Sequence, residues 1–331
     1  MRSFLALAFL TLGLSLFSGC SGHSVFEPED VVDDRDLVDG YDKDLFMQHR
    51  KGLTYENGVV LTKKGLFTKF ALPKGFAYLN ENNNSMIAAD NAGKVLIKAK
   101  EGDGEKVLTL NSRVLSAALK GDTLAVVNVK NEMKVYSLST EKELYTFSGS
   151  AVTAIDVRLA NPRFYEGLLF FPTLDGKIQI FSKASKKMIR TMSVSTAEQF
   201  NNIIFFDIID KRILAATGSK LYLFGKKSHK KALPIRDVFV DGRDIIVLRK
   251  DGTVASLNQD LIVIHEKKYP FAYFLGGLAT KDSIYIVENE GYLLKLKKDF
   301  SLSLVYELDF DQGLFFVGDK SFYFSDGYFT P

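Results

Sequence analysis

Residues that commonly carry chemistry are scarce in this chain of 331 residues, which has one Cys, four His and no Trp. A single Cys excludes an internal disulfide framework, a Cys-based zinc cluster and a redox-active Cys pair. No two histidines have the close spacing of a metal-binding pair; they are His23, His49, His229 and His265. The sequence also lacks a Walker A loop and a Gly-x-Ser-x-Gly motif. We therefore predict no enzymatic activity, no catalytic residue and no metal site.

Three aspartates are the remaining candidates for chemistry: Asp156, Asp207 and Asp237 each fall in a run predicted to be a strand. If those strands surround a common axis, the three carboxylates would converge on it and could bind a cation. The alternative interpretation is that they are a solvated lining, because polar residues are expected wherever an inner strand meets water. The central cation site would support a hydrolase or lyase.

The elements that would position these residues are short strands. From residue 58 onward, apolar or alternating runs are broken by turn residues, and no window keeps a helical period over 12 residues. Seven times, an apolar strand precedes a turn that an alternating strand follows, and Asp-Gly at such a turn strongly indicates a hairpin. The turns from Gly93 to Gly327 are about 39 residues apart. A period near 40 with four strands per unit predicts an all-β fold, the β-propeller.

The number of blades depends on how the first part of the chain is assigned. Seven inner strands are predicted, at 76–79, 114–119, 152–157, 203–208, 237–240, 271–275 and 314–317. The runs at 58–62 and 67–72 precede the first full unit, so we expect them to complete the last blade and close the ring by pairing N- and C-terminal strands. Seven blades are favoured, and eight result if the N-terminal runs form a blade of their own.

Several units resemble PQQ-like propeller repeats. In residues 167–188 an apolar strand, Asp175-Gly176, an alternating strand and a polar turn follow one another as in that family, and 122–143 and 243–260 are similar. Blades of the family often carry a Trp after the last turn, which this chain lacks. We therefore expect Phe, Tyr and Leu to dock the blades. Since the stacking Trp and the adjacent cysteines of quinone-dependent members are missing, no cofactor is predicted.

The single cysteine lies at the end of an export signal. Met1-Arg2 is followed by the apolar run 4–17 and then by Ser18, Gly19 and Cys20. This order is typical of a secretory signal peptide, and the run is too short to span a membrane comfortably. Ser18-Gly19-Cys20 resembles a bacterial lipobox, which implies removal of residues 1–19 and acylation of Cys20 with chains such as palmitate. The residue after the cysteine, Ser21, implies delivery to the outer membrane.

An acidic segment follows the lipobox. Residues 21–44 carry nine Asp or Glu and two Lys or Arg, a formal charge of −7, which leaves about +9 on 45–331. Because like charges repel, residues 20–50 are expected to form an extended, flexible tether, with a single propeller domain over 51–331. The ring carries Lys clusters at 183–187, 226–231 and 295–298. These favour solubility and protected blade edges over a lipid or glycan site.

The combination of lipobox, acidic tether and PQQ-like propeller resembles the BamB family, the propeller lipoproteins of the outer-membrane β-barrel assembly machinery. That resemblance implies a non-enzymatic scaffold, anchored to the outer membrane and facing the periplasm, which binds the barrel insertase through propeller loops and blade edges. That family usually has eight blades. The alternative is an envelope lipoprotein with another protein or glycan partner. The net charge of +3 implies no nucleic-acid partner.

The sequence indicates candidate contact loops only by their length. The connections 158–167 and 194–202 are the longest and are therefore candidates for partner contacts. The apolar stretch that begins at Phe200 is expected to be a buried inner strand.

Overall fold

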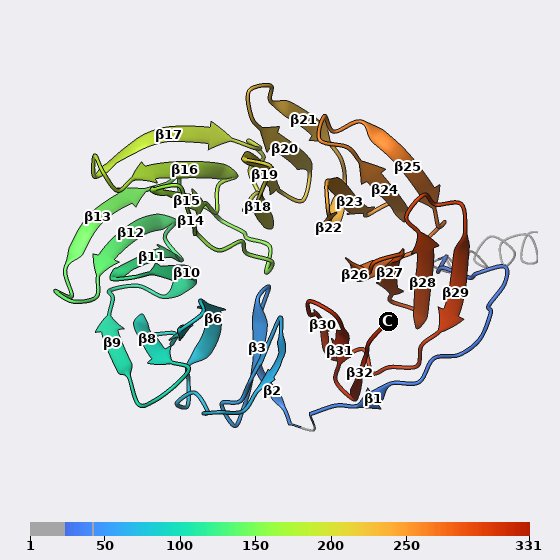
Figure 1. The fold of residues 1–331 in the computed structure, drawn as a ribbon, viewed down its shortest axis with the longest axis horizontal. Helices are drawn as coiled ribbons and strands as arrows, with labels where there is room; N and C mark the ends of the chain where they lie inside the picture. The colour runs from blue at the N-terminus through green and yellow to red at the C-terminus, as the bar shows by residue number, and fades with distance from the viewer. Residues whose placement is uncertain (1–23, 42) are drawn as a thin grey trace, which may run out of the picture.

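The computed structural model describes residues 24–41 and 43–331, which form eight antiparallel four-stranded sheets arranged as the blades of a ring (Figure 1). In these residues there is no helix, and hence none that could span a membrane. Each blade has strands a to d from the centre outward. Blades 1 to 4 contain β2 (Leu45–His49), β3 (Gly52–Tyr55), β4 (Val60–Thr62), β5 (Gly65–Phe67); β6 (Ala77–Glu81), β7 (Ser85–Ala89), β8 (Lys94–Ala99), β9 (Glu105–Thr109); β10 (Val114–Lys120), β11 (Thr123–Asn128), β12 (Glu132–Ser137), β13 (Glu143–Ser148); and β14 (Arg163–Tyr165), β15 (Leu168–Pro172), β16 (Lys177–Ser182), β17 (Lys187–Ser193).

The second half of the ring repeats this arrangement. Blades 5 to 8 contain β18 (Phe205–Ile209), β19 (Arg212–Ala216), β20 (Lys220–Phe224), β21 (His229–Ala232); β22 (Ile235–Asp241), β23 (Asp244–Arg249), β24 (Thr253–Leu257), β25 (Val263–Lys268); β26 (Phe274–Ala279), β27 (Ser283–Glu288), β28 (Tyr292–Lys297), β29 (Ser303–Glu307); and β30 (Phe315–Val317), β31 (Phe322–Phe324), β32 (Gly327–Phe329), β1 (Val38–Asp39).

The burial of each strand follows from its place in the blade. Strand b is packed on both faces by neighbouring blades, so all six residues of β11 are buried. Strand d has one face toward water, and in β25 partly buried and exposed residues alternate. A continuous apolar run therefore indicates strand b, as the sequence pattern suggested. The alternating strand that the sequence predicts after the turn is strand c, and in β16 four of its six residues are buried.

The prediction of seven blades is wrong, and the structure instead has the eight blades of the alternative, in which the N-terminal runs form a blade of their own. The strands at 58–62 and 67–72 were expected to complete the last blade, but β4 and β5 instead pair with β2 and β3 as blade 1. Two physical features concealed this blade. Its inner strand β2 directly follows the acidic segment, and its strand β3 has only four residues.

A repeated hydrogen bond confirms the count of eight. In seven blades, a backbone carbonyl in the turn between strands b and c accepts from an N–H just after strand d, as in Leu72 N to Gly58 O (2.8 Å) and Leu110 N to Gly93 O (2.8 Å). In blade 8 the corresponding bond runs from Gly40 N to Asp326 O (3.2 Å). Gly40 directly follows β1, so β1 occupies the position of strand d in the last blade.

Pairing between the chain's two ends closes the ring, as expected, but the N-terminal strand is a different one. β1 pairs with β32 through Val38 opposite Tyr328 and Asp39 opposite Gly327. This pairing completes blade 8 with a strand from the beginning of the chain (Figure 1). It protects the outer edge of β32, which would otherwise expose unpaired backbone groups.

The segment expected to be a free tether packs on the ring over its described part. Residues 24–39, here called the strap, cross the outside of blades 7 and 8. The Phe26 ring is buried between Tyr269 and Tyr292, at centroid distances of 5.9 and 5.5 Å. Farther along, residues 32–35 exchange backbone hydrogen bonds with the free edge of β29. The propeller therefore includes β2 and the strap, and its boundary does not lie at residue 50.

Blade docking without Trp uses aliphatic and aromatic side chains, as predicted. Leu, Ile and Val fill the layer between blades 5 and 6, whereas Tyr269, Phe274 and Phe26 contribute to the layer between blades 6 and 7. Asparagines add hydrogen bonds between blades. Asn80 Nδ2, for example, donates to Ala117 O on the neighbouring inner strand (2.8 Å). Such bonds fix the angle between blades more specifically than apolar contact alone.

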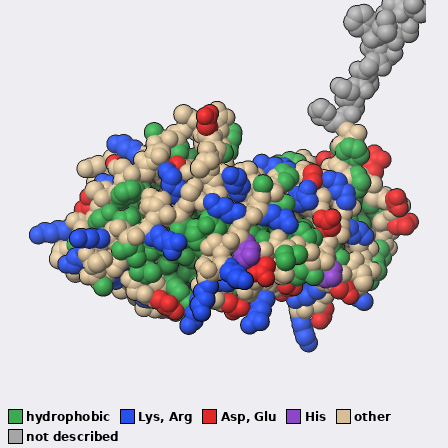
Figure 2. Space-filling view, turned by 90° about the horizontal axis from the view of Figure 1, so that it is seen from above, with side chains coloured by type: hydrophobic (Ala, Val, Ile, Leu, Met, Phe, Trp, Pro, Cys, Tyr) green, Lys and Arg blue, Asp and Glu red, His purple; other side chains and the backbone are tan. Residues whose placement is uncertain are grey.

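The two faces of the ring carry different sets of turns. Because the four strands alternate in direction, the a–b and c–d turns lie on one face, here called the hairpin face, and the b–c turns and d–a connections lie on the other, the loop face. The three Lys clusters at 183–187, 226–231 and 295–298 all include a c–d turn and therefore reach the hairpin face. Figure 2 shows the ring from its side, with Lys and Arg side chains projecting outward from its rim.

Candidate functional site

Two long d–a connections on the loop face come together beside blade 4. One joins β13 to β14 and spans 149–162, and the other joins β17 to β18 and spans 194–204. The first differs from the prediction, because 152–157 contains no strand and β14 supplies the inner strand of blade 4 instead. The expected loop 158–167 accordingly includes a strand. The second connection agrees with the loop expected at 194–202.

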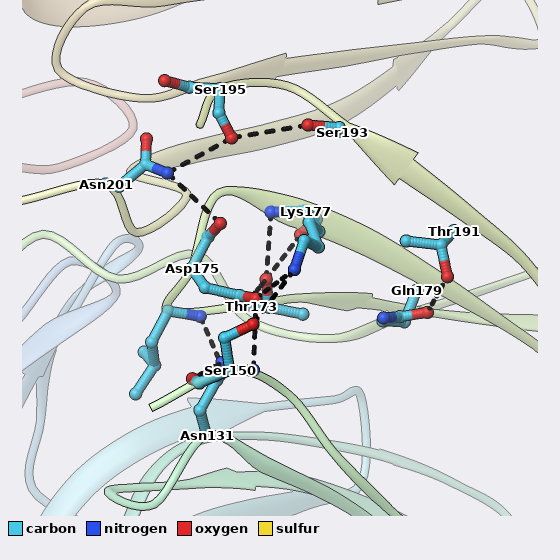
Figure 3. Close-up of polar contacts among 11 residues, drawn as sticks. Asn131, Ser150, Thr173, Asp175, Lys177, Gln179, Thr191, Ser193, Ser195 and Asn201 are labelled. Carbon is cyan, nitrogen blue, oxygen red and sulfur yellow. Dashed lines mark hydrogen bonds and ion pairs between the residues drawn. The ribbon is translucent and has the colours of Figure 1, made fainter. Parts of the chain in front are cut away.

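A polar cluster beneath these connections is centred on Asp175, in the b–c turn of blade 4 (Figure 3). Its Oδ1 accepts from Thr173 Oγ1 (2.6 Å) and its Oδ2 from Lys177 Nζ (2.5 Å). The backbone N–H of Ser150, in the first connection, donates to the same Oδ2 (3.3 Å). One carboxylate thus ties the turn of blade 4 to the connection that precedes the blade.

Electrostatics favour the ionised form of this carboxylate. Burial by itself would raise the pKa of Asp175, but hydrogen bonds from Lys177, Thr173 and Asn131, together with the Lys177 charge, lower it to about 2. The carboxyl of Asp175 is therefore ionised at neutral pH, the state that accepts these hydrogen bonds.

Two asparagines extend the cluster to neighbouring segments (Figure 3). Asn131, in the b–c turn of blade 3, accepts from Leu174 N (2.9 Å) and donates to Ser150 O (2.9 Å). It is fully buried and has a φ of 59°, a conformation that Asn tolerates better than most residues. Asn201, in the second connection, donates to Asp175 O and Ser195 O, both at 3.2 Å.

The two connections also bind each other. Phe200 N donates to Ala154 O (3.2 Å), and the Asn202 side chain accepts from Asp156 N (2.6 Å) while donating to Asp156 O and Arg158 O. The loops are thus held by directional bonds to each other and to the blade below. A rigid platform of this kind reduces the entropy that a binding partner would have to remove.

Exposed apolar and aromatic side chains project from this platform and from the connection between blades 6 and 7. The exposed fractions are 84% for Val157, 57% for Phe200, 65% for Phe271 and 48% for Tyr273. Phe200 and Phe271 have φ values of 49° and 65°, which are costly for residues with a large side chain. Exposed apolar side chains on strained backbone are typical of interaction sites.

Arginines accompany these side chains. The guanidinium carbon of Arg236 lies 3.8 Å from the Tyr273 ring centroid, and its Nη1 donates to the Tyr273 hydroxyl (2.9 Å). Arg158 is held by Asp156, with Nε to Oδ1 at 2.8 Å. Burial by itself would lower the pKa of Arg158, but the hydrogen bond and charge of Asp156, with smaller effects of Asp237 and Tyr273, raise it. We define the loop-face patch as Val157, Phe200, Phe271, Tyr273, Arg158 and Arg236. Exposed aromatic rings and arginines are the residues that most often dominate binding energy at protein interfaces.

The three predicted aspartates do not form a shared carboxylate site. Arg158 pairs with Asp156, Arg163 with Asp207, and Arg50 with Asp237. Moreover, Asp156 lies in a connection rather than on an inner strand. Each carboxylate is thus neutralised by an arginine. Arg158 is only two residues from Asp156, whereas the partners of Asp207 and Asp237 come from distant parts of the chain, which strand periodicity could not reveal. Among the described residues, no three Asp, Glu, His or Cys side chains are grouped as metal ligands.

The remaining predicted residues are dispersed. Cys20 and His23 lie outside the described residues. His49 ends β2, where burial and the neighbouring charge of Arg113 lower its pKa to about 4. His229 Nε2 lies 3.2 Å from Asp260 Oδ1, and the centroid of the His265 ring lies 5.7 Å from that of Phe300.

Sequence reasoning missed most of the loop-face patch. Phe200 was expected on a buried inner strand, but β18 begins only at Phe205 and Phe200 points to solvent. Phe271 was assigned to an inner strand that in fact begins at Phe274. Apolar residues in a propeller are usually core, so a lone exposed Phe carries no signal in the sequence. Only its left-handed backbone distinguishes it.

Comparison with known proteins agrees with this architecture. No family model matches the chain. The plasminogen-binding proteins PgbB of Helicobacter pylori strains J99 and 26695 are 25% and 24% identical to it, over 95% of this chain and 69% of each relative. The structure resembles BamB from Moraxella catarrhalis, with a TM-score of 0.66 at 14% identity, covering 88% of this chain and 98% of that one. It also resembles the C-terminal WD40 domain of Sif2 (TM-score 0.61, 14% identity, 89% and 97% covered).

At these identities the structural similarity shows a shared fold, the β-propeller. The similarity in sequence to PgbB covers nearly the whole chain.

Proposed function

We propose that this chain is a non-enzymatic protein-binding scaffold of the bacterial cell envelope, and that its partner docks on the loop-face patch. The observation that carries the proposal is the exposure of Phe200 and Phe271 on strained, hydrogen-bonded loops. Burying such rings against a partner removes apolar surface from water, and little conformational entropy is lost because the loops are already fixed. The arginine-paired aspartates support a non-catalytic role, since a carboxylate held by a guanidinium is poorly placed to act as a base.

Two partners are supported by different observations. The similarity to PgbB favours plasminogen, and it extends over 95% of the chain. The BamB-like architecture favours the barrel insertase, but at 14% identity that support comes from the fold alone. Plasminogen is therefore the first partner to test.

Binding can be measured by surface plasmon resonance. The chain from Ser21 onward is immobilised, and plasminogen is the analyte. Phe200→Asn and Phe271→Asn remove the two aromatic side chains, and Asn tolerates the left-handed backbone at these positions. We expect the double variant to bind at least tenfold more weakly, because hot-spot aromatics commonly contribute about 2 kcal/mol each. The matched control is Leu144→Asn, which removes an exposed side chain from outer strand β13.

These measurements test the docking site and the identity of the partner separately. If the control and the double variant bind equally well, the loop-face patch is not the docking site. If plasminogen does not bind, affinity capture from detergent-solubilised membranes tests the barrel insertase. Capture of the insertase would assign the assembly role, and failure of both partners would overturn the proposed function.

We further propose that Cys20 carries the lipid anchor and that the protein resides in the outer membrane. The two partners imply opposite sides of this membrane, because plasminogen is encountered outside the cell and the periplasmic domains of the insertase inside. Cys20→Ser should move the protein from the membrane to the soluble fraction. Protease treatment of intact cells would then show on which side the ring lies, and unchanged fractionation of Cys20→Ser would exclude the anchor.

A further inference from the structure

A second site lies in the central channel, toward the hairpin face. Inner strands of blades 1, 5, 6, 7 and 8 line an open cavity of about 370 Å³. Its polar lining includes Arg50 and Lys51 from the β2–β3 turn, Lys63 from the β4–β5 turn and Arg158 from the loop face. Chain topology thus brings four cations from three separate segments to one cavity.

Two of these cations are already fixed in place. Arg50 Nη2 lies 2.9 Å from Asp237 Oδ1 and 3.2 Å from Val238 O, and its guanidinium packs over the Phe205 ring. Arg158 is held by Asp156. Both guanidinium groups are therefore preorganised at the cavity wall, and each has N–H groups that these contacts do not use.

The two lysines have no carboxylate partner among the described residues. Lys51 makes no ion pair or side-chain hydrogen bond there, although its side chain is open to the channel. Lys63 donates to the carbonyl of Val317 and lies 4.7 Å from the Phe316 ring centroid, which leaves further N–H groups free. Asp319 also lines the cavity, but it forms no ion pair with either lysine at 4 Å or less.

The lowered pKa values of Lys51 and Lys63 agree with a positive charge in the cavity that no nearby anion balances. Burial and the charges of Arg50 and Lys51 lower the pKa of Lys63 to about 7, although Asp237 and Asp319 act in the opposite direction. The pKa of Lys51 is lowered by burial and by Arg50. An anion in the cavity would relieve this repulsion.

We propose that the channel binds a small doubly charged oxyanion group, such as the phosphate of a phosphorylated small molecule, between Lys51 and Lys63 with the Arg50 guanidinium alongside. Charge-assisted hydrogen bonds from ammonium and guanidinium groups to oxygen are among the strongest in proteins. The aromatic walls, Phe205, Phe315 and Phe316, would contact the remainder of such a ligand. This site shares Arg158 with the loop-face patch, but the two lysines that carry the proposal lie outside that patch, and the proposal does not depend on the proposed protein partner.

Inorganic sulfate is a suitable probe, because its charge stays at −2 across the pH range of interest. Isothermal titration calorimetry at low ionic strength should detect one sulfate per ring. Lys51→Met and Lys63→Met keep the apolar stems and should each weaken sulfate binding at least tenfold. The control is Lys64→Met at the adjacent position, where the side chain is exposed and lies 3.8 Å from Glu81. It should bind like the unaltered protein.

A pH series tests the same site. The charged groups facing Lys63 are Arg50 and Lys51 on the β2–β3 turn, Asp237 on β22 and Asp319 on the β30–β31 turn. Because Lys63 loses its proton near pH 7, sulfate affinity should fall about tenfold from pH 6 to pH 8 in the unaltered protein and change less in Lys63→Met.

Three results would overturn the proposal: no sulfate binding by the unaltered protein, equal binding by Lys51→Met, or equal loss in Lys64→Met. The far-UV circular dichroism of each variant shows whether it folds. If Lys63→Met does not fold, Lys51→Met alone decides, because that side chain faces the channel.

Discussion

At the scale of single residues, Asp175 shows how one side chain fixes the proposed docking platform. Its carboxylate receives hydrogen bonds from Thr173, Lys177 and the backbone of Ser150, which come from two separate parts of the chain. The Asp-Gly signal predicted a turn here, but only the packing of blade 3 against blade 4 adds the bond from Ser150. The local role could thus be predicted from the sequence, whereas the role between blades could not.

Asp175→Asn should destabilise the ring in a pH-dependent way. The pKa of the carboxyl is about 2 in the fold against 3.8 for an unperturbed Asp, so ionised Asp175 contributes about 2 kcal/mol above pH 4, and this contribution is lost as the pH falls toward 2. Urea unfolding at several pH values should show a gap of that size at pH 7 that closes on acidification. Asp309→Asn, at an exposed position, is the control. A gap that stays constant with pH would contradict this origin.

At the scale of elements, the b–c turn is the feature that repeats most faithfully. Its backbone carbonyl accepts from the end of strand d in blade after blade, so this turn joins the middle of each blade to its outer strand. The sequence predicted these turns well, since Gly and Asn at positive φ are a local requirement. It failed at the turn containing Gly58, where the flanking strands are short and follow an acidic stretch.

Gly252→Ala should therefore be far more costly than Gly218→Ala, although both lie in b–c turns of adjacent blades. At Gly252 the φ is 79° and an added Cβ would lie 2.2 Å from Tyr269 O, whereas at Gly218 the nearest atom would be 3.6 Å away. We expect a loss of at least about 3 kcal/mol for the first variant and a change within about 1 kcal/mol for the second. Chemical denaturation measures both, and equal effects would rule out the close approach as the cause.

At the scale of the whole molecule, the ring depends on its first described residues. The strap covers the edge of β29, supplies strand d of blade 8 and places Phe26 between two tyrosines. Composition alone predicts that residues 21–44, with a formal charge of −7, are solvated and extended. A single buried Phe and backbone pairing nevertheless hold the strap on the ring, because backbone hydrogen bonds do not depend on side-chain charge.

Phe26→Ala should release the strap. Truncating a buried Phe costs about 3 kcal/mol or more, and the loss would fall first on a segment held by few other contacts. Hydrogen exchange of residues 24–39 should therefore accelerate strongly, with smaller changes in blades 2 to 5. Val25→Ala, at the exposed neighbouring position, should leave exchange unchanged. Slow exchange of the strap in Phe26→Ala would show that the Phe26 contact is not what holds it.

The sequence by itself determined the repeated unit of this protein, because strand burial follows a local pattern and six of the eight b–c turns contain a Gly or Asn at positive φ. It also predicted that a strand from the start of the chain closes the ring and that Phe, Tyr and Leu replace Trp between blades. Only the tertiary structure decided which strand closes the ring, that there are eight blades, and that arginines neutralise Asp156, Asp207 and Asp237. It alone brought Phe200 to the surface and gathered Lys51 and Lys63 in the channel. These outcomes depend on contacts between residues up to about 290 positions apart, such as Val38 with Tyr328, and no local pattern encodes such pairs.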